Sequence, residues 1–280
     1  MNHDERTPPG RLDAWMAAHP WHPRLLPYVL YVAILPLVAM AADYNPLLYP
    51  VLYVPQCLLI AFLLWRYRQL TPELTLTFHW LAIPVGIAVC VIWIGLGNAM
   101  IQFFPDRFGI AETDQPHLFL QMSPALKWTS LSLRLLGMSL LVPLFEELFV
   151  RSLLLRSFYS FKQVVIGTNQ WGQDIPGIGD WLMHTKIAQR ADAYDQPFAQ
   201  MFNQTALGAL SITGVMLSTL IFTIGHGMRD WPGAILCGIF YCILLRLTRE
   251  KGLGPVIWAH GITNALLWFY CITTNNWHFL

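Results

Sequence analysis

The feature that most constrains this chain is a series of apolar segments, each about 20 residues long. They lie at residues 25–42, 47–65, 80–104, 129–161, 207–228, 232–248 and 253–274. A helix of ~20 apolar residues has the length that crosses the ~30 Å hydrocarbon core of a bilayer. The fourth segment is long enough for two shorter helices, so the pattern predicts seven or eight transmembrane helices.

Composition supports a membrane protein and excludes several other classes. Of the 280 residues, 55% are hydrophobic and only 12% are charged, which is about half the charged fraction of a soluble domain. The net charge of +1 provides no basic surface for nucleic acid. We therefore expect an all-α, polytopic membrane helical bundle and no nucleic-acid partner.

The polar segments divide the chain and predict its orientation. We expect a polar N-terminal segment at 1–24, N-terminal transmembrane helices within 25–128, and further helices within 129–280, with a polar insertion at about 162–206. With a cytoplasmic N-terminus, the inner segments hold twelve Lys and Arg residues and the outer segments hold three. This bias follows the positive-inside rule. It predicts a multi-pass protein of a bacterial inner membrane with its N-terminus in the cytoplasm.

Ionisable residues inside apolar segments are informative, because each costs ~2.5–3.5 kcal/mol to insert and survives mainly beside a partner or a cavity. The polar residues of this kind are Glu146, Glu147 and Arg151 in the fourth segment, His226 in the fifth, and His260 and Asn264 in the last. Residues four apart share a helix face, so we expect Glu147 to pair with Arg151 while Glu146 points roughly 100° away. Pro143, one turn before Glu147, predicts a kink in that helix.

One carboxylate outside the predicted ion pair, two imidazoles and one carboxamide are groups that could hydrolyse an acyl bond. A carboxylate is a suitable general base for water, and imidazole can help to orient that water. An amide or imidazole N–H can stabilise an oxyanion, which contributes ~3–4 kcal/mol in known hydrolases. The same atoms of Glu146, His226 and His260 could instead hold Zn²⁺. The pattern therefore predicts either a metal-free site or a divalent-metal site.

Three short motifs give these residues a family resemblance. They are EELFVR, which has the pattern EExxxR, FTIGH (Phe222 to His226), which has the pattern FxxxH, and HGITN, which has the pattern HxxxN. In this order on apolar segments, they resemble the CPBP family of intramembrane proteases, which includes the Rce1-type CAAX prenyl endopeptidases. The chain also resembles the bacterial CAAX prenyl protease-related subgroup. The resemblance covers about residues 129–274, which makes 129–280 the catalytic part.

The resemblance implies a fold, an activity and a role for each motif residue. It implies an eight-helix membrane fold with a catalytic cavity inside the bilayer. The activity it implies is hydrolysis of a peptide bond of a membrane-associated or lipid-modified polypeptide, of which a prenylated CaaX peptide is one option. Glu146 would activate the water, and His226 would help to hold it. His260 and Asn264 would form the oxyanion site. The remaining motif residues would support the structure: Glu147, Arg151 and Phe222.

The same residues leave two alternative functions and one geometric conflict. Ionisable groups in membrane helices also build proton relays, so a proton-coupled transporter is an alternative, as is a non-catalytic membrane partner with the same fold. On the boundaries above, His226 lies near the outer end of its helix, whereas His260 lies ~10 Å from the inner face at 1.5 Å per residue. A shared site therefore requires a different boundary or a short, tilted helix.

Overall fold

The computed structural model describes residues 10–108, 119, 122–173, 177–186, 188–189 and 197–279, and within these residues the chain forms helices and connections but no β-strands. The helices are α1 (Arg11–Ala18), α2 (His22–Tyr44), α3 (Leu48–Arg66), α4 (Ala82–Phe103), α5 (Pro105–Phe108), α7 (Pro124–Leu136), α8 (Val142–Glu147), α9 (Leu155–Ser157), α10 (Phe161–Gln173), α11 (Ile178–Met183), α13 (Phe198–Gln204), α14 (Ile212–Ile224), α15 (Trp231–Thr248) and α16 (Gly254–Thr274). Two π-helical turns, Gly137–Leu141 and Leu148–Leu154, join α7, α8 and α9 into one continuous rod. The predicted all-α helical bundle is confirmed.

The predicted apolar segments correspond to the long helices. Among the described residues, five helical segments are long and apolar enough to cross a bilayer: His22–Tyr44, Leu48–Arg66, Ala82–Phe103, Met228–Lys251 and Gly254–Thr274. The fourth predicted segment is the α7–α9 rod, a single helix of about 50 Å rather than two shorter ones. The fifth, α14, has only 13 residues. The prediction of 207–228 was therefore too long at both ends.

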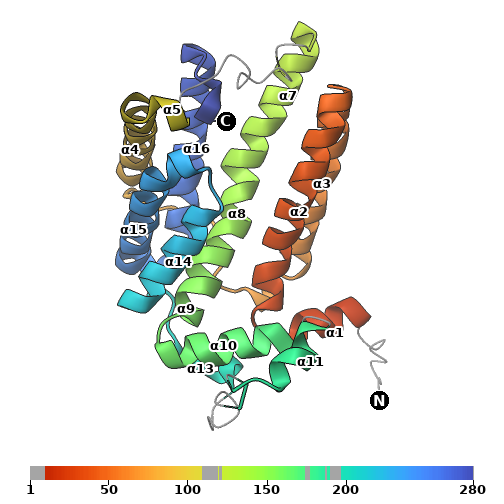
Figure 1. The fold of residues 1–280 in the computed structure, drawn as a ribbon, viewed down its shortest axis with the longest axis vertical. Coiled ribbons are helices and arrows are strands. Elements are labelled where there is room, and N and C mark those ends of the chain that lie inside the picture. The colour runs from red at the N-terminus through yellow and green to blue at the C-terminus, as the bar shows by residue number, and fades with distance from the viewer. Residues whose placement is uncertain are drawn as a thin grey trace, which may run out of the picture.

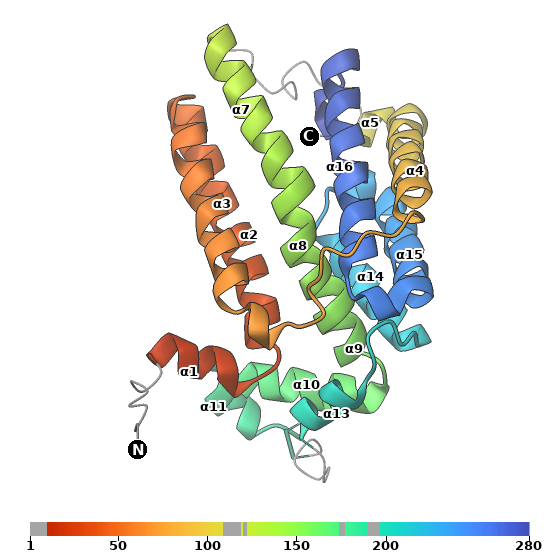
Figure 2. The same ribbon diagram turned by 180° about the vertical axis from the view of Figure 1, so that it is seen from behind.

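The rod stands in the middle of the bundle (Figure 1). Helices α2 and α3 pack together on one side of it, and α4, α14, α15 and α16 pack on the other side, as the reverse view also shows (Figure 2). Large apolar side chains such as Leu37, Met40 and Leu58 remain exposed on the outer helices. An apolar outer surface of this kind fits contact with lipid rather than with water.

The polar insertion predicted at about 162–206 contains helices. It contains α10, α11 and α13, which lie with α1 across the lower end of the bundle in Figure 1; we call these four helices the platform. Phe198 and Phe202 of α13 are fully buried, and Phe198 packs against the buried Trp21 at the start of α2. These helices are short and amphipathic, so a search for runs of ~20 apolar residues does not detect them.

A buried ion cluster joins the platform end of the bundle to its N-terminal part. The Arg24 Nε atom on α2 lies 2.7 Å from Glu73 Oε1, and its Nη2 donates to Glu73 Oε2 at 3.0 Å. Arg156 of α9 lies 3.8 Å from the same carboxylate, and Ser152 also bonds to it. Arg24 lies in the first turn of α2, which begins at His22, so the end of the predicted segment 1–24 overlaps the start of this helix.

Two close backbone contacts hold α16 against its neighbours. A Cβ at Gly261 would lie 2.5 Å from the Ser139 carbonyl oxygen of the first π-turn, and a Cβ at Gly86 of α4 would lie 2.6 Å from the Ala259 carbonyl oxygen. Both distances are too short for any side chain, so these positions require glycine. The position of α16, which carries the HxxxN motif, therefore depends on two residues without side chains.

We expect Gly261→Ala to lower the free energy of unfolding by about 1–3 kcal/mol, because the added methyl group must displace α16 from the rod. The matched control is Gly95→Ala on α4, where nothing lies within 4 Å of the added Cβ. Thermal unfolding of the purified proteins in detergent, followed by tryptophan fluorescence, measures the difference. Equal stability of the two variants would contradict the close contact.

The Glu73 cluster predicts a loss of stability in acid. Burial alone would raise the pKa of Glu73, but the charge of Arg24 and the hydrogen bonds from Arg24 and Ser152 outweigh it and hold that pKa below its usual value. A carboxyl with a lowered folded-state pKa stabilises the fold above its unfolded-state pKa of about 4.3. That contribution is lost as the pH falls through the folded-state pKa.

Glu73→Gln should therefore cost about 3 kcal/mol near neutral pH, because it leaves two buried guanidinium groups without their carboxylate. The stability of wild type should then approach that of the variant as the pH falls below about 4.3. Unfolding of both proteins across this pH range tests the expectation, with the exposed Glu250→Gln as control. Parallel pH profiles for wild type and Glu73→Gln would show that the pair does not contribute.

Candidate active site

The rod carries the EExxxR motif in a locally widened helix. Pro143 has no N–H to donate to the Ser139 carbonyl four residues earlier, and the first π-turn, Gly137–Leu141, lies immediately before this point. The second π-turn, Leu148–Leu154, begins directly after Glu147. The kink predicted at Pro143 is thus a change of helix type. Single π-turns within α-helices occur frequently at functional sites.

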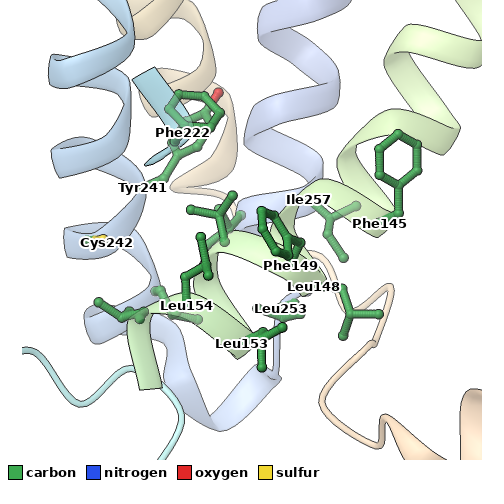
Figure 3. Packing of buried hydrophobic residues seen from close by; sticks show 14 of the residues in the cluster. Phe145, Leu148, Phe149, Leu153, Leu154, Phe222, Tyr241, Cys242, Leu253 and Ile257 are labelled. Carbon is green, nitrogen blue, oxygen red and sulfur yellow. The ribbon is translucent and has the colours of Figure 1, made fainter. Parts of the chain in front are cut away.

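Glu147 and Arg151 form the predicted ion pair in the centre of the bundle. Arg151 Nε lies 3.1 Å from Glu147 Oε2, and both side chains are completely buried. The Arg151 guanidinium also lies over two aromatic rings, 4.8 Å from the centre of Phe222 on α14 and 5.3 Å from that of Tyr241 on α15. Cation–π contacts of this kind are strongest where water is excluded. Apolar side chains of the rod fill the surrounding space between α14, α15 and α16 (Figure 3).

The second oxygen of Glu147 holds His260 of α16. His260 Nδ1 lies 2.7 Å from Glu147 Oε1. Because a carboxylate only accepts hydrogen bonds, Nδ1 carries the hydrogen and donates it. The other ring nitrogen, Nε2, lies 3.7 Å from Glu146 Oε2. The imidazole of His260 therefore lies between the two carboxylates, and Glu147 orients it in addition to pairing with Arg151.

His226 follows α14 and faces the same region from the opposite helix. Its Nδ1 lies 2.8 Å from the Phe222 carbonyl oxygen, so this nitrogen donates and Nε2 is left as an acceptor. Its ring lies 4.6 Å from that of Phe222 and 5.2 Å from that of Trp93, measured between ring centres. Trp231 Nε1 donates to the backbone carbonyl oxygen of His226. The two ring contacts and the Nδ1 bond hold the imidazole in place, and the Nδ1 bond sets its tautomer.

The short α14 resolves the conflict in depth between the two histidines. With 13 residues, it spans only about 20 Å, and it ends at Ile224, two residues before His226. His226 therefore lies on a turn at an intermediate level of the bundle rather than at its outer surface. Both explanations that the sequence allowed apply, since the predicted boundaries were too wide and the helix is short.

Asn264 lies one turn beyond His260 and contacts the rod. Its Nδ2 donates to the Met138 carbonyl oxygen at 2.7 Å, within the first π-turn. A carboxamide nitrogen carries two hydrogens, so one of them is left for a further acceptor. The close contact between Gly261 and Ser139 lies on the same turn of α16 and sets this distance.

One cavity of about 460 Å³ brings these groups together. Residues that line it include Tyr31, Tyr53, Trp93, Arg134, Met138, Phe222, His226, Asp230, Tyr241, His260, Thr263, Asn264, His278 and Phe279. Three of the four predicted catalytic residues are thus on its wall. Glu146, the fourth, is not among these lining residues; its Oε2 lies 3.7 Å from Nε2 of His260, which is among them, and its side chain is 12% exposed.

The predicted zinc ligands do not form a group that could hold a metal. Among the residues that the structure describes, no three His, Cys, Asp or Glu side chains are gathered around one point. In both histidines Nδ1 donates to an oxygen, which leaves Nε2 as the ring nitrogen that could bind a metal. The two Nε2 atoms and the Glu146 carboxylate are not gathered around one point, so this arrangement does not fit a single ion, and we derive no step through one.

Several residues of the site were not predicted from the sequence. Tyr241 donates to or accepts from Thr263 at 2.8 Å, and Thr263 in turn bonds to the Gly86 carbonyl oxygen. Trp93 contacts His226 from α4. Aromatic and hydroxyl side chains are common in membrane helices, as interfacial anchors or packing contacts, so nothing in the sequence pattern distinguishes these.

The contacts of the two glutamates predict that Glu147 contributes strongly to the stability of the fold and that Glu146 contributes little. Glu147→Gln should cost about 3–5 kcal/mol of unfolding free energy, because it leaves the buried Arg151 without its carboxylate. Glu146→Gln, which keeps that ion pair, should stay within about 1 kcal/mol of wild type. Thermal unfolding in detergent compares the two. If both variants lost the same stability, the ion pair would not be the structural centre of the site.

The part of the chain that carries the site matches a known protein family. Residues 128–266 match the family described as type II CAAX prenyl endopeptidase Rce1-like. The match includes the rod, α14, α15 and most of α16, and hence all three motifs. No curated protein and no solved structure gives a significant match to the chain. With their three motifs and their match to this family, residues 128–266 of the chain belong to the Rce1-like family of CAAX prenyl endopeptidases.

Proposed function

We propose that this protein is an intramembrane endopeptidase that hydrolyses a peptide bond of a membrane-associated or lipid-modified polypeptide. We further propose that it lies in a bacterial inner membrane with its N-terminus in the cytoplasm. The observation that carries the proposal is the position of His260, held at Nδ1 by Glu147 with Nε2 directed at Glu146. A carboxylate and an oriented imidazole next to a cavity are the parts that water activation requires.

Glu146 is the proposed general base. A substrate water near the Glu146 carboxylate would give up a proton to it as the water oxygen attacks the carbonyl carbon of the peptide bond. The proton would then pass to the amine nitrogen as the C–N bond breaks, so the carboxylate is regenerated. His226 Nε2, which is free to accept because Nδ1 donates to Phe222, would help to hold the water.

The proposed oxyanion site consists of His260 and Asn264. An imidazole that carries hydrogen on both ring nitrogens would donate from Nε2 of His260, together with the second amide hydrogen of Asn264. Both donors are fixed in advance, by Glu147 and by the Met138 carbonyl. Fixed donors stabilise a developing oxyanion without any cost of reorganisation.

Removal of the base should abolish cleavage without unfolding the protein. We expect Glu146→Gln to lower the cleavage rate by about 10²–10⁴-fold, and Asn264→Ala by about 10²–10³-fold. The assay compares inner membranes of a host that produces wild type or variant protein, and uses mass spectrometry to find the new polypeptide termini. Glu250→Gln on an exposed turn is the control.

The same experiment separates the alternatives. Folded Glu146→Gln protein that still generates every new terminus would contradict the peptidase. A transporter would instead lose ion-dependent flux in proteoliposomes, with no termini changed. A non-catalytic partner would keep its effect on the host in all of these variants.

A further inference from the structure

The bundle has two distinct ends. The lower end in Figures 1 and 2 holds the platform and the turn at 249–253. The 67–81 segment starts at this end and leads from α3 to α4. The connections at 45–47 and 225–230, helix α5 and the turn Trp277–Phe279 belong to the opposite half. We call this half the distal half.

Positive charge is concentrated at the platform end. Ten described residues lie there: Arg11, Arg24, Arg66, Arg68, Arg156, Lys162, Lys186, Arg246, Arg249 and Lys251. Three lie in the distal half outside the spans: Arg107, Lys127 and Arg229. Arg6 and Arg190, which belong to the predicted inner segments, lie outside the described residues. By the positive-inside rule, the platform end faces the cytoplasm.

The cavity lies in the distal half. Its wall includes Tyr53 near the distal start of α3 and Phe222 in the last turn of α14. Beyond these it continues to Asp230, His278 and Phe279, which belong to the distal connections. The polar groups of the candidate active site therefore lie at the end of the cavity that is nearest the platform, near the middle of the bundle.

The platform end is closed below the site. From the site toward the platform, the first layer is the buried Glu147–Arg151 pair. The second layer is the cluster of Arg24, Glu73 and Arg156. Phe198, Phe202 and Trp21 then fill the contact between the platform and the rod, with at most 2% of each side chain exposed. Two buried layers of ion pairs and one aromatic layer thus separate the site from the cytoplasmic end.

We infer that the candidate active site opens to the extracytoplasmic side of the membrane, so that its substrate is an exported, membrane-anchored polypeptide cleaved on or near the outer side. The substrate part of this inference rests on the proposed peptidase function, whereas the direction of opening does not. The direction follows from the charge asymmetry of the two ends and from the half of the bundle that holds the cavity.

Sided labelling of a single cysteine tests the direction. Met138→Cys places a thiol on the cavity wall beside Asn264, in a Cys237→Ala background that removes the native thiol lining the cavity. A membrane-impermeant maleimide is added to spheroplasts and to inverted membrane vesicles. We expect labelling in spheroplasts and loss of labelling in inverted vesicles. Lys251→Cys, exposed at the platform end, is the matched control with the opposite expectation.

Every outcome of the labelling decides the inference. Labelling of Met138→Cys from inverted vesicles alone, from both sides equally, or from neither side would overturn it. His278→Cys, farther out on the same wall, is measured in parallel in case the first variant does not fold. Labelling needs no turnover, so a protein without peptidase activity still gives a result.

The substrate class is tested separately by the positions of cleaved bonds. New termini that disappear with Glu146→Gln should map to the outer side of exported membrane proteins. Termini that map to cytoplasmic segments would overturn the substrate class. If no termini changed while labelling still came from outside, the proposed function would fail and the direction of opening would stand.

Discussion

The buried pair of Glu147 and Arg151 is the interaction on which the other contacts of the site depend. A guanidinium in an apolar bundle is unstable without a carboxylate, because the cost of removing it from water is several kcal/mol. Here the carboxylate divides its two oxygens between Arg151 and His260, while the guanidinium rests on Phe222. One ion pair thus connects the EExxxR motif to the motif on α14 and to the motif on α16. The three motifs are separate in sequence but share a single electrostatic centre.

The backbone of the rod is adapted to this arrangement. Pro143 withdraws a hydrogen bond from the Ser139 carbonyl, and the helix turns from α to π around it. The released carbonyl groups then serve the neighbouring helix, since Met138 accepts from Asn264 and Ser139 lies against Gly261. A regular α-helix would use these oxygens internally. The irregularity is therefore what allows α16 to approach and to present its imidazole and amide.

The sequence predicted the helical membrane fold, the motif residues and the Glu147–Arg151 pair, because these follow from segment length and from helical spacing. It did not predict the helices of the insertion, since α10 and α13 bury only one face each. It also did not assign His260 to Glu147, because this contact joins residues 113 positions apart. The catalytic roles of Glu146, His226, His260 and Asn264 remain proposals, although His260 lies beside Glu146 and three of the four residues share a cavity wall.

The half-length α14 has a consequence for the surrounding lipid. A helix of about 20 Å cannot match a hydrocarbon layer of ~30 Å, so the turn that carries His226 sits at a depth where acyl chains would normally be. Bilayer thickness therefore sets how far this turn is immersed, and longer acyl chains would cover it more deeply. Lipid composition thereby becomes a physical variable of the site itself, independent of any change in the protein.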